Sequence, residues 1–410
     1  MFFFVVFCIA LVGCNGASIP EETFTREDLD LLMVQTFGDS DNFTVECLID
    51  SQGYPVETHH VTTSDGYILA LHRIPHGRTS RNKGKVAFLQ HGLLASSADW
   101  CILGAGKALA FQLADEGYDV WLGNARGNSW SRNHTTLKPS DIEFWDFSWH
   151  EIGIIDIPTM IDYVLETTGQ SAVYYVGHSQ GTTAYYVMLS RLPEYNKKIA
   201  AAASLAPIAF MNHMTSPLLH ILSFWTGTMD FLFNIIGMYE FLPNDNFMKR
   251  VMSDTVCACD TISQLLCTNS LFAICGFSRS QMNTTLLPYL MKFTPAGSST
   301  HQLLHYGQEI KSGRFRQYDF GLLSNTIIYG RLTPPGYDLS KVTAATYLIY
   351  SKNDWLSSEK DVLRLCDAMK VGCKGKILMS DFEFNHLDYM FGIDAPKLVY
   401  NKVISLFARH

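Results

Sequence analysis

Short apolar runs recur along the chain, and their pattern predicts the architecture of most of it. Most contain five to eight residues with few polar positions, which is typical of β-strands buried on both faces of a sheet. Segments with apolar side chains at helical spacing separate several runs, and this alternation predicts a mostly parallel sheet with helices on both faces. The expected strands are residues 60–63, 67–74, 86–90, 118–122, 172–176 and 199–205, and the expected helices are 106–116, 150–168 and 182–189.

Local signals refine this pattern near three of the elements. The Ser-Asp-Gly sequence of residues 64–66 predicts a hairpin turn between the first two strands. Pro158 predicts a kink or a restart within the helix 150–168, because proline lacks the amide hydrogen that a helix interior requires. A short helix is expected at residues 29–34, ahead of the first strand.

The alternation stops after residue 207 and resumes near residue 340. The intervening segment is rich in Met, Phe and Trp and contains helical runs near 218–241, 259–275 and 299–311. Beyond it we expect strands at 345–350 and 376–379 and helices at 359–369 and 395–408. The pattern therefore predicts residues 18–206 and 341–410 as two parts of one α/β core, and residues 207–340 as an inserted, mainly helical cap.

The first twelve residues are almost entirely apolar, and small residues follow them. This arrangement is too short for a membrane span and predicts a secretory signal peptide of residues 1–17. A bacterial lipoprotein signal ending at Cys14 and a buried N-terminal strand are the alternatives. The run 218–242 is also apolar, but Asp230 and Glu240 argue against a span there. We therefore expect no transmembrane segment in the mature chain.

Composition excludes several classes of protein. Of the 410 residues, 47% are hydrophobic and 17% are charged, so a disordered or fibrous protein is excluded. The net charge is −8 and the sequence has no basic stripe, which argues against nucleic acid as a partner. No cluster of Lys and Arg suggests attraction to an anionic membrane surface either.

Eight cysteines remain after the predicted signal peptide, and an even number in an exported protein permits disulfides. The first candidate pair is Cys267 with Cys275, and the second is Cys366 with Cys373. A Cys-Ala-Cys sequence at 257–259 lacks further ligands at zinc spacing, so we expect no metal site. Three Asn-x-Thr tripeptides predict glycosylation in a secreted chain, at Asn42, Asn133 and Asn283.

The sequence Gly-His-Ser-Gln-Gly at residues 177–181 joins the expected strand 172–176 to the helix that follows it. This G-x-S-x-G pattern between a strand and a helix is typical of a nucleophile elbow, with Ser179 as the nucleophile. Glycines flank the serine because a side chain there would collide with the neighbouring strand or helix. The alternative is an ordinary turn between a strand and a helix.

A serine hydroxyl needs a base, and the base needs an acid that orients it. Chain order in proteins with such an elbow is serine, acid, histidine. Among the candidate bases, His386 follows the last expected strand, whereas His410 is the final residue of the sequence. Asp354 comes four residues after the strand 345–350 and is the expected acid.

Each of these two residues has a plainer alternative. His386 could be a surface loop histidine, and Asp354 could serve as a helix N-cap or loop carboxylate. Asp381 and Glu383 are close to His386 in sequence, but they follow the wrong strand for the usual order. Acyl transfer also needs two N–H donors for the oxyanion. We expect these from the backbone of Gln180 and of Leu93, with Gly92 allowing the turn.

Several stretches together resemble the eukaryotic acid lipases, the family of gastric and lysosomal acid lipases. The resemblance covers about residues 25–408. It implies an α/β-hydrolase fold with a helical cap, no cofactor, and Ser179, Asp354 and His386 as nucleophile, acid and base. It also implies an oxyanion hole from Leu93 and Gln180, and a Cys267–Cys275 disulfide in the cap. The matching stretches are 53–57, 63–67, 89–96, 126–128, 131–132, 177–181, 267–277, 318–321 and 386–389.

The sequence thus predicts a secreted or lysosomal serine lipase that cleaves acylglycerols or sterol esters through an acyl-enzyme. Its expected partners are a lipid ester and a lipid–water interface. One alternative is a small-ester esterase, thioesterase or acyltransferase on the same triad. Another is a catalytically idle lipid-binding protein. The apolar run 218–242 either packs on the core or opens to expose an acyl-chain groove and an interface-binding patch.

Overall fold

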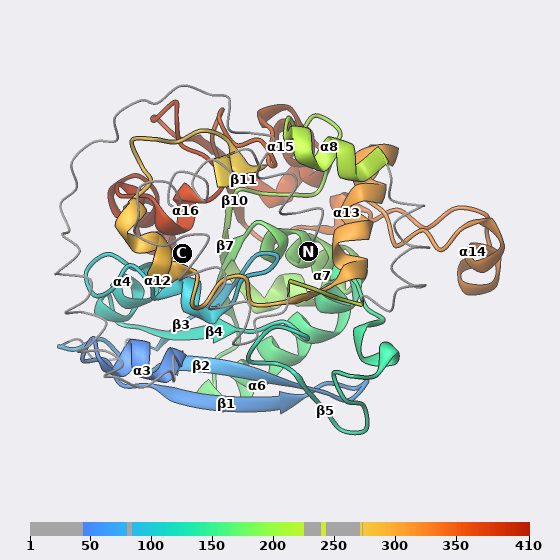
Figure 1. Cartoon of the computed structure of the whole chain (residues 1–410). Coiled ribbons are helices and arrows are strands. Elements are labelled where there is room, and N and C mark those ends of the chain that lie inside the picture. The colour runs from blue at the N-terminus through green and yellow to red at the C-terminus, as the bar shows by residue number, and fades with distance from the viewer. Residues whose placement is uncertain (1–43, 80–83, 225–238, 243–270, 273) are drawn as a thin grey trace.

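The structure is a computed structural model that describes residues 44–79, 84–224, 239–242, 271–272 and 274–410. Its centre is a nine-stranded sheet with the order β1-β2-β4-β3-β6-β7-β10-β11, and β5 pairs with β2 (Figure 1). The strands from β4 to β11 are parallel to their neighbours, whereas β2 is antiparallel to β1, β4 and β5. The strands are β1 Glu57–Thr62, β2 Tyr67–Ile74, β3 Lys85–Gln90, β4 Tyr118–Gly123, β5 Asn133–His134, β6 Val173–His178, β7 Ile199–Leu205, β10 Thr346–Tyr350 and β11 Cys373–Leu378.

Both faces of this sheet are buried, as the apolar runs predict. In β6, Tyr174 and Val176 belong to one hydrophobic cluster, and Val173 and Tyr175 belong to the other. Side chains of a strand alternate between its two faces, so the two clusters lie on opposite sides of the sheet. One cluster includes α4 (Leu109–Asp115) and α17 (Asn401–Phe407), and the other includes α6 (Ile157–Thr168), α7 (Gln180–Arg191) and α15 (Glu359–Met369). The predicted α/β-hydrolase arrangement is confirmed.

Several element boundaries differ from the sequence pattern. The strands β2 and β7 and the helix α15 have the expected bounds, but β1 begins three residues earlier than expected. The apolar pattern missed residues 57–59 because they are not apolar. The expected helix 150–168 is interrupted. It starts as α5 (Trp149–Glu151), continues as a π-helical turn (Ile152–Asp156) and restarts as α6, with Pro158 in its first turn. Pro158 therefore marks a restart, where its missing amide hydrogen costs nothing.

The segment between β7 and β10 leaves the sheet and returns to the adjacent position, where Leu205 pairs with Ile349. Its described elements are α8 Pro217–Phe224, β8 Glu240–Phe241, α12 Leu287–Leu290, β9 Ser298–Ser299, α13 Thr300–Ser312 and α14 Leu322–Tyr329. The expected helix 299–311 is α13. The expected helix 218–241 is described only as α8, and its end is the strand β8. Most of the expected helix 259–275 lies outside the described residues. The pattern did not predict α12 or α14, and α14 projects from the body of the molecule (Figure 1).

Further helices lie near the two ends of the described chain. The helix α3 (Val45–Asp50) was not predicted, and Thr44 caps its start with a side chain that accepts a hydrogen bond from the amide of Cys47. The helix expected at 29–34 lies outside the described residues. The C-terminal helix begins as a π-helical turn (Pro396–Tyr400) before α17, and α16 (Asp388–Phe391) precedes it. No helix of the described ranges is long and apolar enough to cross a membrane.

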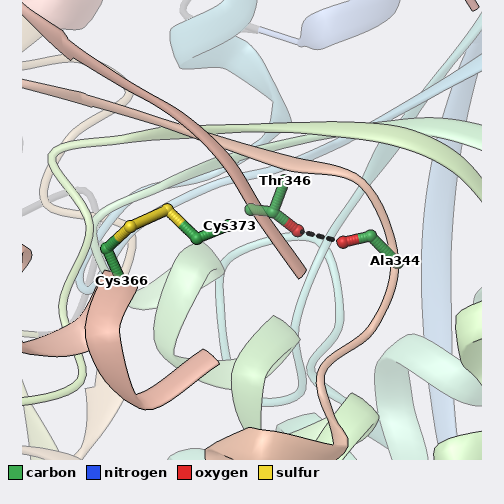
Figure 2. The surroundings of a disulfide bond; sticks show 4 residues. All are labelled: Ala344, Thr346, Cys366 and Cys373. Atoms are coloured by element: carbon green, nitrogen blue, oxygen red, sulfur yellow. Dashed lines mark hydrogen bonds between the residues drawn. A yellow bond between two sulfur atoms is a disulfide. The ribbon is translucent and has the colours of Figure 1, made fainter. Parts of the chain in front are cut away.

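One disulfide joins Cys366, near the end of α15, to Cys373, at the start of β11 (Figure 2). Cys373 is opposite Thr346 of the neighbouring strand β10, and the hydroxyl of Thr346 donates to the carbonyl of Ala344. This is the second of the two pairs that the spacing suggested. It ties the helix α15 to the edge of the sheet.

The Cys267–Cys275 disulfide expected from the resemblance is wrong for this structure. Cys275 is a buried free thiol, and Cys267 lies outside the described residues. The carbonyl of Cys275 accepts hydrogen bonds from the amides of Trp355 and His386. Burial raises the pKa of the Cys275 thiol. The spacing of two cysteines does not decide whether their side chains face each other, and here the thiol faces the interior beside Asp354.

Candidate active site

The turn between β6 and α7 holds Ser179 in a conformation that side chains rarely adopt, with φ 50° and ψ −118°. Such strain persists only where the surrounding structure imposes it. Here the amide of Ser179 donates to the carbonyl of Leu205 at 3.0 Å, and its carbonyl accepts from the amide of Thr182 at 2.8 Å. The turn therefore has the backbone strain of a nucleophile elbow.

The flanking glycines are required by close backbone approaches, as predicted. A Cβ atom on Gly181 would lie 2.3 Å from the carbonyl oxygen of Gln90, and one on Gly177 would lie 2.9 Å from the carbonyl carbon of Gly181. Neither neighbour is a flexible side chain that could move aside. Glycine at both positions allows the helix α7 to start directly against the strands β3 and β6.

Three residues from distant parts of the chain form a hydrogen-bonded series. The Nε2 atom of His386 is 2.8 Å from Oγ of Ser179. The Nδ1 atom of His386 is 3.0 and 2.9 Å from the two carboxylate oxygens of Asp354. All three residues are buried, with 8% of Ser179, 2% of Asp354 and 3% of His386 exposed. A serine, a histidine and an aspartate in this arrangement can deprotonate the serine and stabilise the resulting imidazolium.

Asp354 lies in the loop after β10, and its Oδ1 atom also accepts hydrogen bonds from the amides of Leu356 and Ser357, at 2.9 and 2.8 Å. Asp354 is therefore also a loop carboxylate, the alternative that the sequence left open, and these loop contacts help to position it for His386. Two backbone donors hold the carboxylate in place, while both its oxygens remain within reach of His386. Ser357 is held in turn, because its hydroxyl donates to the carbonyl of Pro207.

The loop that carries His386 is tied down on both sides. The amide of Asn385 donates to the carboxylate of Asp388 at 2.7 Å, and the side-chain amide of Asn385 donates to the carbonyl of Gly276 at 2.8 Å. The Nε2 atom of His178 donates to the carbonyl of His386 at 3.0 Å. Burial lowers the pKa of His178 to about 3, so His178 stays neutral and keeps this donor. His178 directly precedes the nucleophile, and it therefore links the backbone of the base to the elbow.

The loop after β3 lies directly against the nucleophile. A Cβ atom on Gly92 would be 3.1 Å from Cβ of Ser179, so glycine allows this loop its close approach to the nucleophile. Within the described part of the chain, the backbone amides of Leu93 and Gln180 donate no hydrogen bond. Both amides are therefore available to an oxyanion formed at Ser179.

His91 sets the orientation of this loop, a role that the sequence patterns did not reveal. Its Nδ1 atom donates to the carbonyl of Gly92 at 2.8 Å, and its Nε2 atom accepts from the amide of Ala125 at 3.1 Å. Burial lowers the pKa of His91 to about 4, so the ring is neutral. In a planar peptide the carbonyl and the next N–H point in opposite directions. Because His91 holds the Gly92 carbonyl, it aims the Leu93 N–H the other way.

Two further residues beside the site were also missed. His178 is inside the G-x-S-x-G pattern, but that pattern leaves the x positions open. Gln302, on α13, accepts a hydrogen bond from the side chain of Gln180, which brings the inserted segment into contact with the residue after the nucleophile. No local signal could have identified Gln302, because the contact spans 122 positions.

The rejected candidates lie away from the triad. The carboxylate of Asp381 accepts from the side chain of Gln281 and from the amide of Glu383, and His410 contacts the hydroxyl of Tyr347. Of the glycosylation candidates, Asn133 is exposed, Asn283 caps a short helical turn, and Asn42 lies outside the described residues. The Cys-Ala-Cys sequence at 257–259 also lies outside them. Among the described residues no cluster of His, Cys, Asp and Glu could hold a metal ion.

The chain matches two families of known proteins. Residues 45–104 match the family described as a partial alpha/beta-hydrolase lipase region, and residues 88–249 match the family described as the alpha/beta hydrolase fold. Among solved structures, an acetylester hydrolase from Corynebacterium glutamicum has a TM-score of 0.50 at 15% identity, with 88% of this chain and 97% of that chain covered. At this identity the similarity supports the fold alone.

Similarity to curated proteins extends over most of the chain. Lipase 3 of Drosophila melanogaster is 43% identical, with 87% of this chain and 90% of that protein covered. Gastric triacylglycerol lipase of Rattus norvegicus is 40% identical, and lysosomal acid lipase/cholesteryl ester hydrolase of Homo sapiens is 39% identical. Each alignment with these two proteins covers 90% of this chain and 92% of the relative.

Proposed function

This chain belongs to the acid lipase family of α/β hydrolases, and we propose that Ser179, His386 and Asp354 are the catalytic triad of its lipase activity. The protein is a carboxylic ester hydrolase. The single observation that carries the triad assignment is the pair of contacts made by the His386 ring, at 2.8 Å to Ser179 and 2.9 Å to Asp354. Lipid esters are its substrates, as the names of its relatives imply.

The geometry supports a two-step acyl transfer. The Oγ atom of Ser179 attacks the ester carbonyl carbon while Nε2 of His386 takes the hydroxyl proton. The carbonyl oxygen becomes an oxyanion, which the N–H groups of Leu93 and Gln180 stabilise. When the C–O bond to the alcohol breaks, His386 returns the proton to the departing alcohol. Water then attacks the acyl-enzyme while His386 takes a proton from it, and His386 returns this proton to Oγ of Ser179 as the bond to the acyl group breaks and the acid leaves.

Asp354 supports both steps without exchanging a proton. It accepts a hydrogen bond from Nδ1 of His386, which fixes the tautomer whose Nε2 is free to accept from Ser179. The same carboxylate stabilises the imidazolium that forms in each step. Its two backbone donors, the amides of Leu356 and Ser357, keep its position while the charge on the ring changes.

We also propose that residues 207–340 form a cap that takes part in binding the lipid chain. The contact between Gln302 of this segment and Gln180 beside the nucleophile supports the proposal.

The secretory route is suggested by the gastric and lysosomal relatives and by the apolar N-terminal residues. As part of the same proposal, residues 1–17 are a signal peptide that is removed on this route, and the mature protein is secreted or lysosomal. Asn42, Asn133 and Asn283 are the proposed glycosylation sites.

A fluorophosphonate probe tests the nucleophile directly. The native protein should be labelled at Ser179, and Ser179→Ala should take up no label. If the two proteins behave identically, the triad assignment fails and the idle lipid-binding alternative gains support. Hydrolysis rates on a long-chain triacylglycerol emulsion and on a soluble short-chain ester then separate a lipase from a small-ester esterase. A lipase should favour the emulsion, whereas an esterase should favour the soluble ester.

A further inference from the structure

The helix α14 and the turn after it expose a group of large apolar side chains. Leu323 and Ile327 are each 85% exposed, and they lie one helical turn apart on the same side of the helix. Single exposed apolar residues are common on proteins, but a contiguous group of them marks an interaction surface. The other members of this group are Phe320, Leu322, Ile328 and Leu332.

The polarity of α14 is the reverse of that of an ordinary surface helix, which buries apolar side chains. Its one buried residue is Asn325. The side chain of Asn325 donates to the carboxylate of Asp319 at 2.8 Å and to the carbonyl of Leu332 at 3.0 Å, and it accepts from the amide of Phe320 at 3.0 Å. The Asn325 side chain thus satisfies backbone groups that flank the helix, and the most exposed apolar residues, Leu323 and Ile327, are left on the outer side.

The segment is firmly held, so the exposed side chains are presented by a fixed structure. At its base, the amide of Gln317 donates to the carbonyl of Pro335. The hydroxyl of Tyr329 donates to the carbonyl of Tyr318 at 2.9 Å. The inner side also borders a cavity of about 180 Å³, whose lining mixes polar and apolar side chains and includes Asp146, His301, Phe320 and Ile328. The hydrogen bonds at its base therefore hold the segment in this position, with Leu323 and Ile327 exposed.

The charge of the segment favours a lipid surface as the partner. From 320 to 337 the sequence contains a single charged residue, Arg331, although the whole chain has 39 acidic residues and a net charge of −8. Carboxylates are costly to bring to the acyl region of a lipid layer, whereas apolar side chains are stabilised there. An arginine can keep its charge at the headgroups while its stem lies along apolar surface.

The helix α13 connects this segment to the nucleophile. Its residue Gln302 contacts Gln180, and its residue Gln308 pairs with Asp319 at the base of α14, through hydrogen bonds of 2.8 and 2.9 Å. Six residues of helix separate the two contacts, a rise of about 9 Å. Docking through α14 would therefore hold the cap and the residue beside Ser179 at a defined position near the lipid.

We propose that residues 320–332 are the site by which this protein docks on a lipid surface, with Leu322, Leu323 and Ile327 inserted among the acyl chains. The choice of a lipid partner rests on the proposed lipase function. These residues are distinct in sequence from the apolar run 218–242, for which the sequence suggested an interface-binding role. Residues 320–332 bind the lipid surface, whereas the triad acts on a single ester molecule drawn from that surface.

Vesicle binding tests this proposal independently of hydrolysis. The probe is sedimentation with vesicles of dialkyl-ether phosphatidylcholine, which contains no ester to cleave. The double variant Leu323→Ser/Ile327→Ser should bind at least about tenfold more weakly than the native protein, because partitioning scales with the apolar area inserted. Its rate on a soluble short-chain ester should stay unchanged, and its rate on a long-chain emulsion should fall. Val371→Ser is the matched control, since Val371 is 63% exposed on the turn after α15, and it should bind as the native protein does.

Each other outcome has a distinct meaning. Equal vesicle binding by the native protein and the double variant would overturn the docking proposal. If light scattering instead shows a native dimer that the double variant breaks, with vesicle binding retained, α14 is a contact between two copies and the proposal is also wrong. Failure of the lipase function would appear differently, as absence of hydrolysis of both esters by a native protein that still binds vesicles.

Discussion

The Nε2 atom of His386 lies 2.8 Å from Oγ of Ser179, although 207 positions separate the two residues in the chain. The elbow follows β6 and the histidine loop follows β11, and β7 and β10 lie between those strands in the sheet. These four strands run parallel, so their carboxyl ends meet at one edge. His386 comes eight residues after Leu378, the last residue of β11, and this length of chain can reach across that edge.

The acid of the triad is tested by Asp354→Asn. Asparagine keeps the shape of the carboxylate, but it favours the wrong histidine tautomer and does not stabilise the imidazolium. Loss of this function typically lowers kcat by about 10⁴-fold. Far-ultraviolet circular dichroism and the unfolding midpoint should show that the variant is folded, and kcat on a soluble ester is the measured quantity.

Asp381→Asn serves as the control for that variant. Asp381 is near His386 in sequence but contacts Gln281 and the amide of Glu383 instead of the triad, so this variant should retain nearly native kcat. A native rate for Asp354→Asn, or an equal loss in both variants, would mean that the acid lies elsewhere.

The role of His91 is tested by two substitutions at that position. His91→Ala removes the shorter hydrogen bond to the Gly92 carbonyl and leaves that of the Ala95 amide at 3.4 Å, so the N–H of Leu93 should be less well aimed at the oxyanion. We expect kcat to fall about 10- to 100-fold, less than or similar to the loss of a whole oxyanion donor. KM for a soluble ester should change little, because the oxyanion forms only after binding.

His91→Asn should recover part of this loss, since its amide nitrogen can occupy about the place of Nδ1 and donate to the Gly92 carbonyl. The partial recovery of kcat distinguishes orientation of the oxyanion hole from a general role in stability. If the two variants lose kcat equally, or if kcat follows only the loss of stability, His91 has a structural role alone.

The buried Asp99 predicts a dependence of stability on pH. Its Oδ1 atom accepts from the hydroxyl of Thr294 at 2.9 Å, and burial raises its pKa from 3.8 to about 7. Between these two values the unfolded chain releases a proton that the folded chain keeps. The contribution of Asp99 to stability is therefore complete below about pH 4 and is lost as the pH rises towards 7.

Asp99→Asn removes this titration while it retains a polar side chain for Thr294. The free energy of unfolding of the variant, relative to that of the native protein, should therefore rise from pH 4 to pH 7, by up to about 4 kcal/mol. Urea unfolding of both proteins at the two pH values measures it. The buried His91 and His178, which titrate at acid pH, are common to both proteins and cancel in the difference. A difference independent of pH would contradict the raised pKa.

The sequence by itself determined the alternation of strand and helix and the identity of the candidate triad. Apolar period and glycine position are local properties, set by the pleat of a strand, the pitch of a helix and the sterics of one turn. The order serine, acid, histidine along the chain then selected Asp354 and His386. Each follows an expected strand, and parallel strands bring their carboxyl ends to one edge of the sheet.

Only the tertiary structure decided how side chains from distant segments face one another. It placed Cys275 as a buried free thiol, contrary to its expected pairing. It also revealed that His91 holds the Gly92 carbonyl and that Gln302 contacts Gln180. In α14 a single buried Asn325 turns the apolar side outwards. The physical reason is common to these cases. Orientation and exposure depend on which surfaces pack together, and packing is fixed by contacts across many residues rather than by the spacing of any local pattern.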